Sequence, residues 1–332
     1  MRLQASAPTR IDLAGGTLDI WPLYLLHDGV QTVNAAITLR ASCTVSPCAG
    51  GRLRLAARDT GATAEVADVA DLDDTHPALR LPARVLRFFK ASGVAVETRS
   101  DSPVGAGLAG SSAMNIALCA AMARWRDRRI EPEALLDLAR DIEVQVIGVP
   151  TGGQDYRPAL YGGVSAIEFG PAGVHRVPLR VPPRALEERM VVVYTGQSRD
   201  SGINNWEVTK RRIDGDTSLA GLFDEIRDTA ARVREAMEGA DWTELARSVG
   251  HEWELRKQLA PGVTTEWIET LFRRAFDAGA DAGKVCGAGG GGCVVFLAEP
   301  DATASVRRAL DEAGASLLDC GIDTEGLRLT AR

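Results

Sequence analysis

The feature that most constrains this chain is a glycine-rich loop that runs directly into an apolar helix. Residues 101–114 read DSPVGAGLAGSSAM and place Gly105, Gly107 and Gly110 just before two serines and a run of helix formers. Backbone N–H groups of such a loop can form a concave anion site, and the N-terminus of the next helix adds partial positive charge. The loop therefore predicts a phosphate-binding site. A plain turn that ends in a serine N-cap is the alternative, and one glycine-rich match does not decide between them.

Composition and charge limit the class of protein. The 332 residues are long enough for two domains, and 45% hydrophobic with 25% charged residues is typical of a globular protein. A net charge of -7 disfavours nucleic acid or an acidic membrane as the main partner. The apolar run at 113–123 is too short to span a bilayer. Six cysteines without a C-x-x-C pair indicate free thiols, so we expect a cytoplasmic protein with neither a membrane nor a nucleic-acid partner.

Hydrophobic periodicity predicts mainly strands in the first third of the chain and mainly helices after residue 200. Alternation over 37–45 and 52–57 indicates half-buried strands. A helix over 112–125 is apolar nearly all round and should be buried, whereas a helix over 132–147 is amphipathic. A Gly- and Pro-rich loop follows at 149–164. Further expected elements are a helix at 79–91, strands at 94–100, 164–169 and 190–194, helices at 219–237, 242–259, 265–278 and 302–313, a second glycine loop at 284–299 that runs into a strand, and a last short strand.

Two carboxylates complete the parts that phosphoryl transfer needs. The reaction requires backbone donors for phosphate oxygens, a Mg²⁺ held by hydroxyl and carboxylate oxygens, and a group that orients the acceptor hydroxyl. The loop over 105–112, Glu143 and Asp155 supply such groups. Glu143 borders the apolar stripe of its helix, where a carboxylate is costly unless it is paired or metal-bound. A salt bridge to Arg140 is the alternative interpretation of Glu143.

Three motifs occur in order along the chain: APTRIDLAGGTLD at 7–19, SPVGAGLAGSSAM at 102–114 and KVCGAGGGGC at 284–293. Together they resemble the three motifs of the GHMP kinases, which include galactokinase, homoserine kinase, mevalonate kinase and phosphomevalonate kinase. The segments AGGTLD, GLAGSSA, GGQD and YTGQSR are similar to the bacterial sugar-1-kinase branch that contains D-glycero-D-manno-heptose 7-phosphate kinase. Leu18 and the pair Ala109-Gly110 depart from that branch and leave the identity of the sugar open.

The resemblance implies an α+β, two-domain GHMP kinase fold. The N-terminal domain, 1–185, would be like domain 2 of ribosomal protein S5, and the C-terminal domain, 186–332, would be ferredoxin-like, with the active site in the cleft between them. ATP and Mg²⁺ are the implied cofactors, and a sugar or sugar phosphate is the implied partner of a monomer or homodimer. The leading expectation is transfer to an anomeric hydroxyl, as in a heptose 7-phosphate 1-kinase.

Three other functions stay open beside this one. They are a galactokinase- or fucokinase-like hexose kinase, a mevalonate-pathway kinase, and a catalytically silent sugar sensor on the same fold. The GGQD segment favours a sugar over mevalonate. Retention of Ser112, Glu143 and Asp155 together disfavours a silent sensor.

The resemblance also implies roles for residues around the nucleotide. Ser112 and Glu143 match the Mg²⁺ ligands of the family, with Ser111 as the alternative hydroxyl. Asp155 matches the residue that orients or deprotonates the acceptor hydroxyl. Arg10 would keep Asp155 ionised, or else form only a structural ion pair at a domain seam. The residues implied to bind the nucleotide are Pro103, Gly105, Ala106, Gly107, Leu108, Gly110, Ser111 and Ser112.

Acceptor binding is implied for a second set of residues. Asp19 would accept hydrogen bonds from sugar hydroxyls, and the remaining candidates are Gly15, Gly16, Gly153, Gln154, Thr195, Gly287, Ala288, Gly289 and Gly290. An acceptor that already carries a phosphate also needs cations. Candidates for these are Arg157, Arg199, Lys210, Arg211 and Arg212, although a KRR run is also typical of a solvated helix face.

Overall fold

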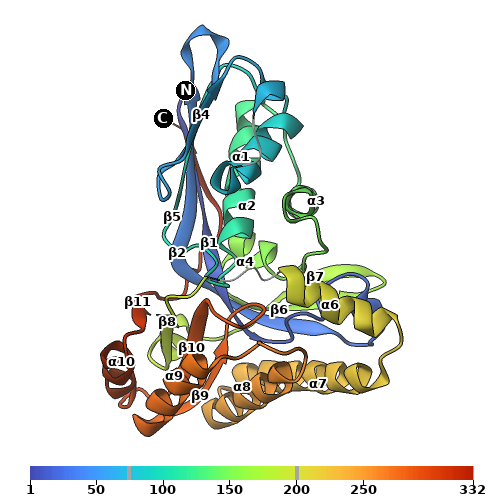
Figure 1. Ribbon diagram of the computed structural model, residues 1–332, viewed down its shortest axis with the longest axis vertical. Coiled ribbons are helices and arrows are strands. Elements are labelled where there is room, and N and C mark those ends of the chain that lie inside the picture. Colours follow the sequence, from blue (N-terminus) through green and yellow to red (C-terminus); the bar gives the residue numbers. More distant parts are fainter. Residues whose placement is uncertain (73–75, 199–201, 332) are drawn as a thin grey trace.

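Two long antiparallel strands run through most of the molecule. The computed structural model describes residues 1–72, 76–198 and 202–331. In it, β1 (Leu3–Ala14) pairs with β2 (Gln31–Pro47). Residues 41–47 of β2 also pair with β5 (Val94–Ser100), and residues 31–35 pair with β6 (Val164–Gly170). Figure 1 shows β1 and β2 continuing from the upper into the lower part of the molecule, so continuous strands join the two parts.

The remaining strands extend this sheet on both sides. Its order is β12-β1-β2-β5-β3-β4, with β6 paired to β2 and β7 paired to β6. The added strands are β3 (Leu53–Ala57), β4 (Thr63–Val66), β7 (Gly173–Pro178) and β12 (Arg328–Ala331). Because β12 pairs with β1, the two ends of the chain lie side by side (Figure 1). The last strand of the chain therefore completes the sheet that the first strand began.

Four helices cover one face of the upper half of this sheet. They are α1 (Pro77–Phe88), α2 (Gly110–Trp125), α3 (Pro132–Ile147) and α4 (Tyr156–Tyr161). Every residue of α2 from 112 to 123 is buried, which confirms the helix expected to be apolar all round. Since α2 packs on both β1 and β2 and also contacts α1, α3 and α4, it forms the centre of the layer.

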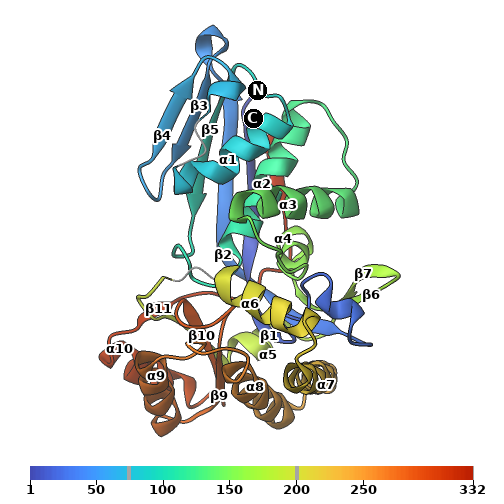
Figure 2. The same cartoon turned by 45° about the vertical axis from the view of Figure 1, so that its right-hand side comes forward.

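A second, four-stranded sheet lies in the lower part. Its order is β11-β8-β10-β9, and all its pairings are antiparallel. Trp253 and Phe296 both pack on Phe272, with ring centroids 5.5 and 5.1 Å from it. In Figure 2, α6 lies between the α3–α4 layer and the α7–α8 pair. The elements of this part are α5 (Pro183–Glu187), β8 (Met190–Tyr194), α6 (Gly202–Ile213), α7 (Thr217–Gly239), α8 (Trp242–Lys257), α9 (Glu266–Asp277), β9 (Ala280–Val285), β10 (Cys293–Ala298), α10 (Thr303–Glu312) and β11 (Ser316–Leu318).

One hydrophobic cluster joins the two sheets. It contains Ile11 and Val33 of the first sheet, Val192 and Val295 of the second, and Val233 of α7. Burial of such side chains at the junction stabilises the relative position of the two sheets. The α+β layout expected from the sequence is confirmed. Across the described ranges, none of the helices combines the length and apolar character that crossing a bilayer would need.

Periodicity predicts neither α4, nor α6, nor β7. The α4 helix is only six residues long and follows the glycines of the 149–164 loop, and its contacts with β1 and α2 come from distant parts of the chain. Such short elements depend on tertiary packing rather than on local propensity. The helix that begins directly after Asp155 was therefore hidden within a segment whose composition indicated a loop.

A buried aspartate fastens the C-terminal segment to the first sheet. The Asp323 carboxylate pairs with Arg40 of β2, and its Oδ1 accepts hydrogen bonds from the N–H groups of Glu325 at 3.0 Å and Gly326 at 2.9 Å. The side chain of Asp323 is 2% exposed. A buried carboxylate of this kind is stable only with its partners in place.

We expect Asp323→Ala to lower the free energy of unfolding by about 3 kcal/mol, because it leaves the Arg40 guanidinium and two N–H groups without their acceptor. Chemical denaturation monitored by circular dichroism measures this difference. Asp319→Ala is the control, since the Asp319 side chain is 87% exposed in its ion pair with Arg307 and should change stability by less than about 1 kcal/mol. If both substitutions lowered the free energy of unfolding equally, the buried contacts of Asp323 would not stabilise the C-terminal segment.

Candidate active site

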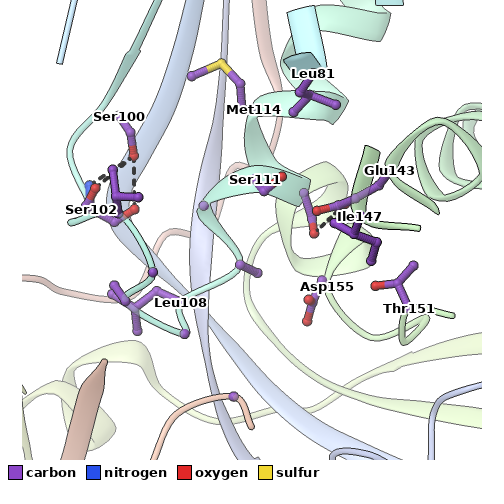
Figure 3. Close-up of a pocket in the computed structure, with 18 of the residues that line it drawn as sticks. Leu81, Ser100, Ser102, Leu108, Ser111, Met114, Glu143, Ile147, Thr151 and Asp155 are labelled. Atoms are coloured by element: carbon purple, nitrogen blue, oxygen red, sulfur yellow. Dashed lines mark hydrogen bonds between the residues drawn. The ribbon is translucent and has the colours of Figure 1, made fainter. Parts of the chain in front are cut away.

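A single cavity of about 600 Å³ collects most of the residues singled out in the sequence. Its walls include the first glycine loop, the start of α2, the first turns of α1, the end of α3 and the segment before α4. The turn after β1, the second glycine loop and one residue each of α6 and α8 complete them. Figure 3 shows Leu81 and Met114 at one end of the view, and Glu143 and Asp155 beside the first turn of α2. The apolar end offers a surface for a flat ring, and the polar end gathers ionisable groups.

The first glycine loop adopts the conformations that its sequence favours. Gly105 and Gly107 have φ values of +68° and +73°, and Ala109 also lies in the left-handed region at +59°. Ala109 is the N-cap of α2 and makes no side-chain cap. The serine N-cap that would explain the loop as a plain turn is therefore wrong. The first N–H groups of an α-helix have no partner within the helix, so the α2 N-terminus presents donors beside the cavity.

The two glycine loops touch through their backbones. A Cβ at Gly107 would overlap the carbonyl oxygen of Cys286, and a Cβ at Gly292 would lie 2.8 Å from the carbonyl oxygen of Ala106. The N–H of Cys293 donates to that same Ala106 oxygen at 2.7 Å. The glycines of the second loop thus allow close approach to the first loop, in addition to lining the cavity.

Glu143 is a buried carboxylate held by hydroxyl groups. Its Oε2 accepts hydrogen bonds from Ser112 Oγ at 2.8 Å and from the Tyr156 hydroxyl at 2.7 Å. Burial raises the pKa of Glu143, and the nearby charge of Asp155 adds to this shift. Arg140 pairs instead with Asp137 and Asp141, so the salt bridge considered for Glu143 is wrong.

This environment suits a divalent cation. No lysine or arginine within the described ranges forms an ion pair with Glu143, although burying an unpaired carboxylate is costly. Carboxylate and hydroxyl oxygens are the ligands that Mg²⁺ prefers. Those ranges contain no cluster of three or more His, Cys, Asp or Glu side chains that could hold a metal without further ligands. The donor set fits an ion that takes its other ligands from phosphate oxygens and water.

Asp155 is paired with Arg10. Arg10 Nε and Nη2 donate to Asp155 Oδ1 at 2.9 and 2.6 Å, and Nη1 donates to the Gly107 carbonyl at 2.6 Å. Burial alone would lower the pKa of Arg10, but the charges of Asp155 and Asp12 outweigh it and raise that pKa. Arg10 thus stays charged, and it ties the carboxylate of Asp155 to the first glycine loop.

The acceptor candidates converge on Asp19. Its Oδ2 accepts a hydrogen bond from the Gln154 N–H at 3.1 Å, and a Cβ at Gly152 would overlap the same carboxylate. Burial, followed by the charge of Asp155, raises the pKa of Asp19 to about 7. Gln154 Oε1 is buried and has no hydrogen-bond partner among the described residues. This end of the cavity therefore holds polar atoms that are free to bind a ligand.

The structure places the predicted residues in two groups. Arg10, Asp19, Glu143, Gln154, Asp155, Gly287, Ala288 and the eight residues of the nucleotide set line the cavity. Six acceptor candidates are not among the lining residues: Gly15, Gly16, Gly153, Thr195, Gly289 and Gly290.

These six residues contact other parts of the chain. Gly15 lies against the backbone of Gln31, Gly16 against Arg256 and Gln154, and Gly153 against Phe169. The Thr195 N–H donates to Gly292 at 2.9 Å, and the Gly290 N–H donates to Val263 at 2.6 Å, beside which Gly289 also packs. The contacts of these glycines and of Thr195 serve close packing around the cavity.

The basic residues proposed for an acceptor phosphate lie elsewhere. Arg157 donates to Glu133 and to the Val174 carbonyl, and Arg212 donates to His27. Arg211 pairs with Asp216, and Lys210 lies 4.0 Å from Glu207. None of these four lines the cavity, which favours the helix-face interpretation of the KRR run. Arg199 lies outside the described residues.

Sequence reasoning missed many of the cavity residues, among them the polar side chains of Thr17, Asn205 and Arg256. Thr17 Oγ1 donates to Asn205 Oδ1 at 3.3 Å, and Arg256 reaches both Gly16 and Thr17 from α8. Arg256 stands four residues after Glu252, a spacing that in sequence resembles an ordinary surface ion pair. No local signal distinguishes it.

We expect Gly107→Ala to weaken nucleotide binding by at least about tenfold and to destabilise the protein, because the new methyl group would force the two glycine loops apart. Nucleotide affinity from calorimetry and unfolding midpoints measure both effects. Gly61→Ala is the control for backbone strain alone, since Gly61 has the same φ of +73° but no atom within 4 Å of its Cβ position. Equal losses in both variants would show that the contact with Cys286 has no effect.

Comparison of the sequence with known proteins supports the family that the three motifs resemble. The model of the GHMP kinases N terminal domain matches residues 79–163, and the GHMP kinases C terminal model matches residues 233–316. D-glycero-alpha-D-manno-heptose 7-phosphate kinase of Campylobacter jejuni is 28% identical over 98% of both chains. Mevalonate kinase of Thermococcus sibiricus is 28% identical over 99% of this chain and 98% of its own.

A solved structure extends the likeness to the fold. The crystal structure of a D-glycero-D-manno-heptose 1-phosphate kinase from Bacteroides thetaiotaomicron superposes with a TM-score of 0.80 at 26% identity, covering 99% of each chain. The two-domain fold that the motifs implied is confirmed. With both family models matched in order and full-length likeness to family members, the chain belongs to the GHMP kinases, a family of ATP-dependent kinases.

Proposed function

We propose that the protein is an ATP- and Mg²⁺-dependent kinase that transfers the γ-phosphoryl group to the anomeric hydroxyl of a sugar phosphate of the heptose 7-phosphate type. The observation that carries the proposal is the presence of two differently solvated carboxylates, Glu143 and Asp155, beside the α2 N-terminus in one cavity. The full-length likeness to heptose phosphate kinases supports the class of acceptor.

The roles follow from the environment of each group. The glycine loop and the α2 N-terminus would hold the ATP phosphates through backbone N–H groups. Ser112 and Glu143 would hold Mg²⁺, which when bound neutralises charge on phosphate oxygens. Asp155 accepts both Arg10 hydrogen bonds at Oδ1, so its Oδ2 would accept a hydrogen bond from the acceptor hydroxyl. Because phosphoryl transfer passes through a loose transition state, orienting this hydroxyl contributes more than removing its proton.

Asp19 and Gln154 would bind the acceptor's other hydroxyl groups. Buried polar atoms left unpaired favour a ligand that supplies the missing hydrogen bonds and disfavour one that lacks them. A sugar carries several adjacent hydroxyl groups, and the carboxylate of Asp19 can accept from two of them. The same two side chains would discriminate poorly among small alcohols with a single hydroxyl.

A panel of acceptors tests the function. ADP release is measured with sugars, sugar phosphates including heptose 7-phosphates, and mevalonate, while a reducing-sugar assay follows the free anomeric centre. The proposal expects the highest kcat/KM with a sugar phosphate and a loss of reducing ends equal to the ADP released. Faster turnover of unphosphorylated hexoses would indicate a galactokinase- or fucokinase-like role. A product that remains reducing would place the phosphate on another hydroxyl and overturn the anomeric assignment.

We expect Asp155→Asn to lower kcat by roughly 10²–10⁴-fold while ATP affinity stays within about threefold, because the amide keeps the shape but not the charge that orients the acceptor. Steady-state kinetics and nucleotide titration measure the two quantities. Asp319→Asn removes an exposed carboxylate from an arginine pair and should leave kcat unchanged. If Asp155→Asn retained most of its kcat, the assigned role would be wrong.

We expect Glu143→Gln and Ser112→Ala each to raise the Mg²⁺ concentration for half-maximal rate by about tenfold or more, since each removes a metal ligand. The matched control is Glu133→Gln on the same helix. Glu133 also accepts a tyrosine hydroxyl bond, from Tyr161 at 3.0 Å, but pairs with Arg157 and lies outside the cavity lining. Mg²⁺ titrations that coincide for Glu143→Gln and Glu133→Gln would exclude the metal role.

A further inference from the structure

Arg256 joins three segments of the chain at the acceptor end of the cavity. It projects from α8 and is only 2% exposed. Its Nη1 donates to the Gly16 carbonyl at 2.8 Å, and its Nη2 donates to the Gly287 carbonyl at 2.8 Å and to Thr17 Oγ1 at 3.4 Å. One guanidinium thus binds the turn that follows β1 and the start of the second glycine loop, which are 271 positions apart in the sequence.

A buried network of charges holds Arg256 in this place. Glu252, one turn earlier on α8, lies 3.5 Å from Arg256 and 3.1 Å from Lys284 Nζ. Lys284 Nζ also donates to Asp12 Oδ2 at 2.9 Å, and Asp12 Oδ1 accepts the Gly287 N–H at 3.0 Å. The side chains of Asp12, Glu252 and Lys284 are fully buried, and that of Arg256 nearly so. The network therefore hydrogen-bonds both backbone groups of Gly287: Asp12 accepts from its N–H, and Arg256 donates to its carbonyl oxygen.

Such a network needs a reason other than stability. Replacing buried ion pairs by well-packed apolar residues is often neutral or stabilising, so these charges are weak evidence for a purely structural role. Burial alone would raise the pKa of Asp12, but Lys284 and then Arg10 and Arg256 lower it, which keeps the carboxylate charged. Asp12 thus stays charged where it binds Gly287, and Gly287 and Arg256 both line the cavity.

The turn that Arg256 binds carries acceptor-facing groups. Thr17 has a φ of +76°, which is a strained conformation for a β-branched residue, and its hydroxyl donates to Asn205. Asp19 follows two positions later. A strained residue persists only when its surroundings fix it, and Arg256 holds this one at the Gly16 carbonyl and the Thr17 hydroxyl. Arg256 Nε is buried and has no hydrogen-bond partner within the described ranges.

We propose that Arg256 is a positioning residue for the acceptor. It clamps the Gly16–Thr17 turn to Gly287 and so fixes Thr17 and Asp19 relative to Asp155. This inference rests on the proposed function for the nature of the acceptor, but the clamp itself is a property of the two loops. A misplacement of about 1 Å in reacting groups can cost about 10²-fold in rate, which sets the size of the effect.

Kinetics of Arg256→Lys and Arg256→Ala provide the first test, with the acceptor that the wild-type enzyme turns over fastest. We expect kcat/KM for the acceptor to fall by about 30-fold or more in both variants, with the KM for ATP within about threefold. Millimolar guanidinium should restore part of the activity of Arg256→Ala. The control is Arg211→Met, because Arg211 also donates to a backbone carbonyl, that of Leu259 at 3.2 Å, but lies outside the cavity lining. If the KM for ATP rose as much as the KM for the acceptor, and guanidinium restored no activity, the positioning role would be overturned.

Hydrogen exchange measured by mass spectrometry tests the clamp without any acceptor. In Arg256→Lys, we expect amide exchange to accelerate by about tenfold or more in both 15–20 and 286–292, with no change in residues 41–47 of β2. Lysine keeps the charge but cannot span two carbonyl groups, so folding should be preserved. Unchanged exchange in either segment would overturn the clamp. Faster exchange in both, in an enzyme that phosphorylates no sugar or sugar phosphate, would support the clamp and reject the proposed function.

Discussion

The contact between the two glycine loops is the constraint on which the site depends. The backbone of Gly107 lies against Cys286, and the backbone of Cys293 is bonded to Ala106, so two loops almost two hundred residues apart meet without side chains between them. Only glycine permits this approach, because any Cβ at Gly107 would overlap a carbonyl oxygen. Each loop in turn lines the same cavity, so the contact fixes the walls that the two loops contribute relative to one another.

Charge distribution gives the carboxylates of the site different properties. Asp12 is surrounded by Lys284, Arg10 and Arg256, which keep its pKa low despite burial. Asp19 forms no ion pair among the described residues, and although the charge of Arg10 lowers its pKa, burial outweighs this and raises the pKa to about 7. Glu143 has hydroxyl donors only, and its pKa is also raised by burial. Carboxyl groups of the same chemistry can thus serve as a structural anion, a hydrogen-bonding group and a metal ligand, because their neighbours differ.

The resemblance predicted the first glycine loop and most of the ionisable groups discussed for the cavity, whereas local rules alone predicted fewer of these residues. Ser112, Glu143 and Asp155 come together as the motifs implied, and the helix expected at 112–125 is α2. Two interpretations that used only local patterns are wrong, since Ala109 rather than a serine is the N-cap of α2 and Arg140 pairs with Asp137 and Asp141 instead of Glu143. A cap and an i−3 ion pair each compete with contacts that a local window does not contain. The solvated helix face, which is the local interpretation of the KRR run, is favoured because these residues do not line the cavity. The resemblance itself implied Thr195, Gly289 and Gly290 for the acceptor, but these residues contact Gly292 and Val263 and do not line the cavity.

The sequence by itself determined the conformation of the first glycine loop and which helix would be buried, because glycine conformations and apolar periodicity are local properties of the chain. It also carried the ordered motifs that resemble one family. Tertiary structure alone decided that β12 returns to β1, that Lys284 lies between Asp12 and Glu252, and that Arg256 binds the carbonyl groups of both Gly16 and Gly287. These outcomes depend on which distant segments share a buried space. A charge reveals its role only when its partners are known, because burial and pairing, rather than residue type, determine what a buried charge costs and what it can bind.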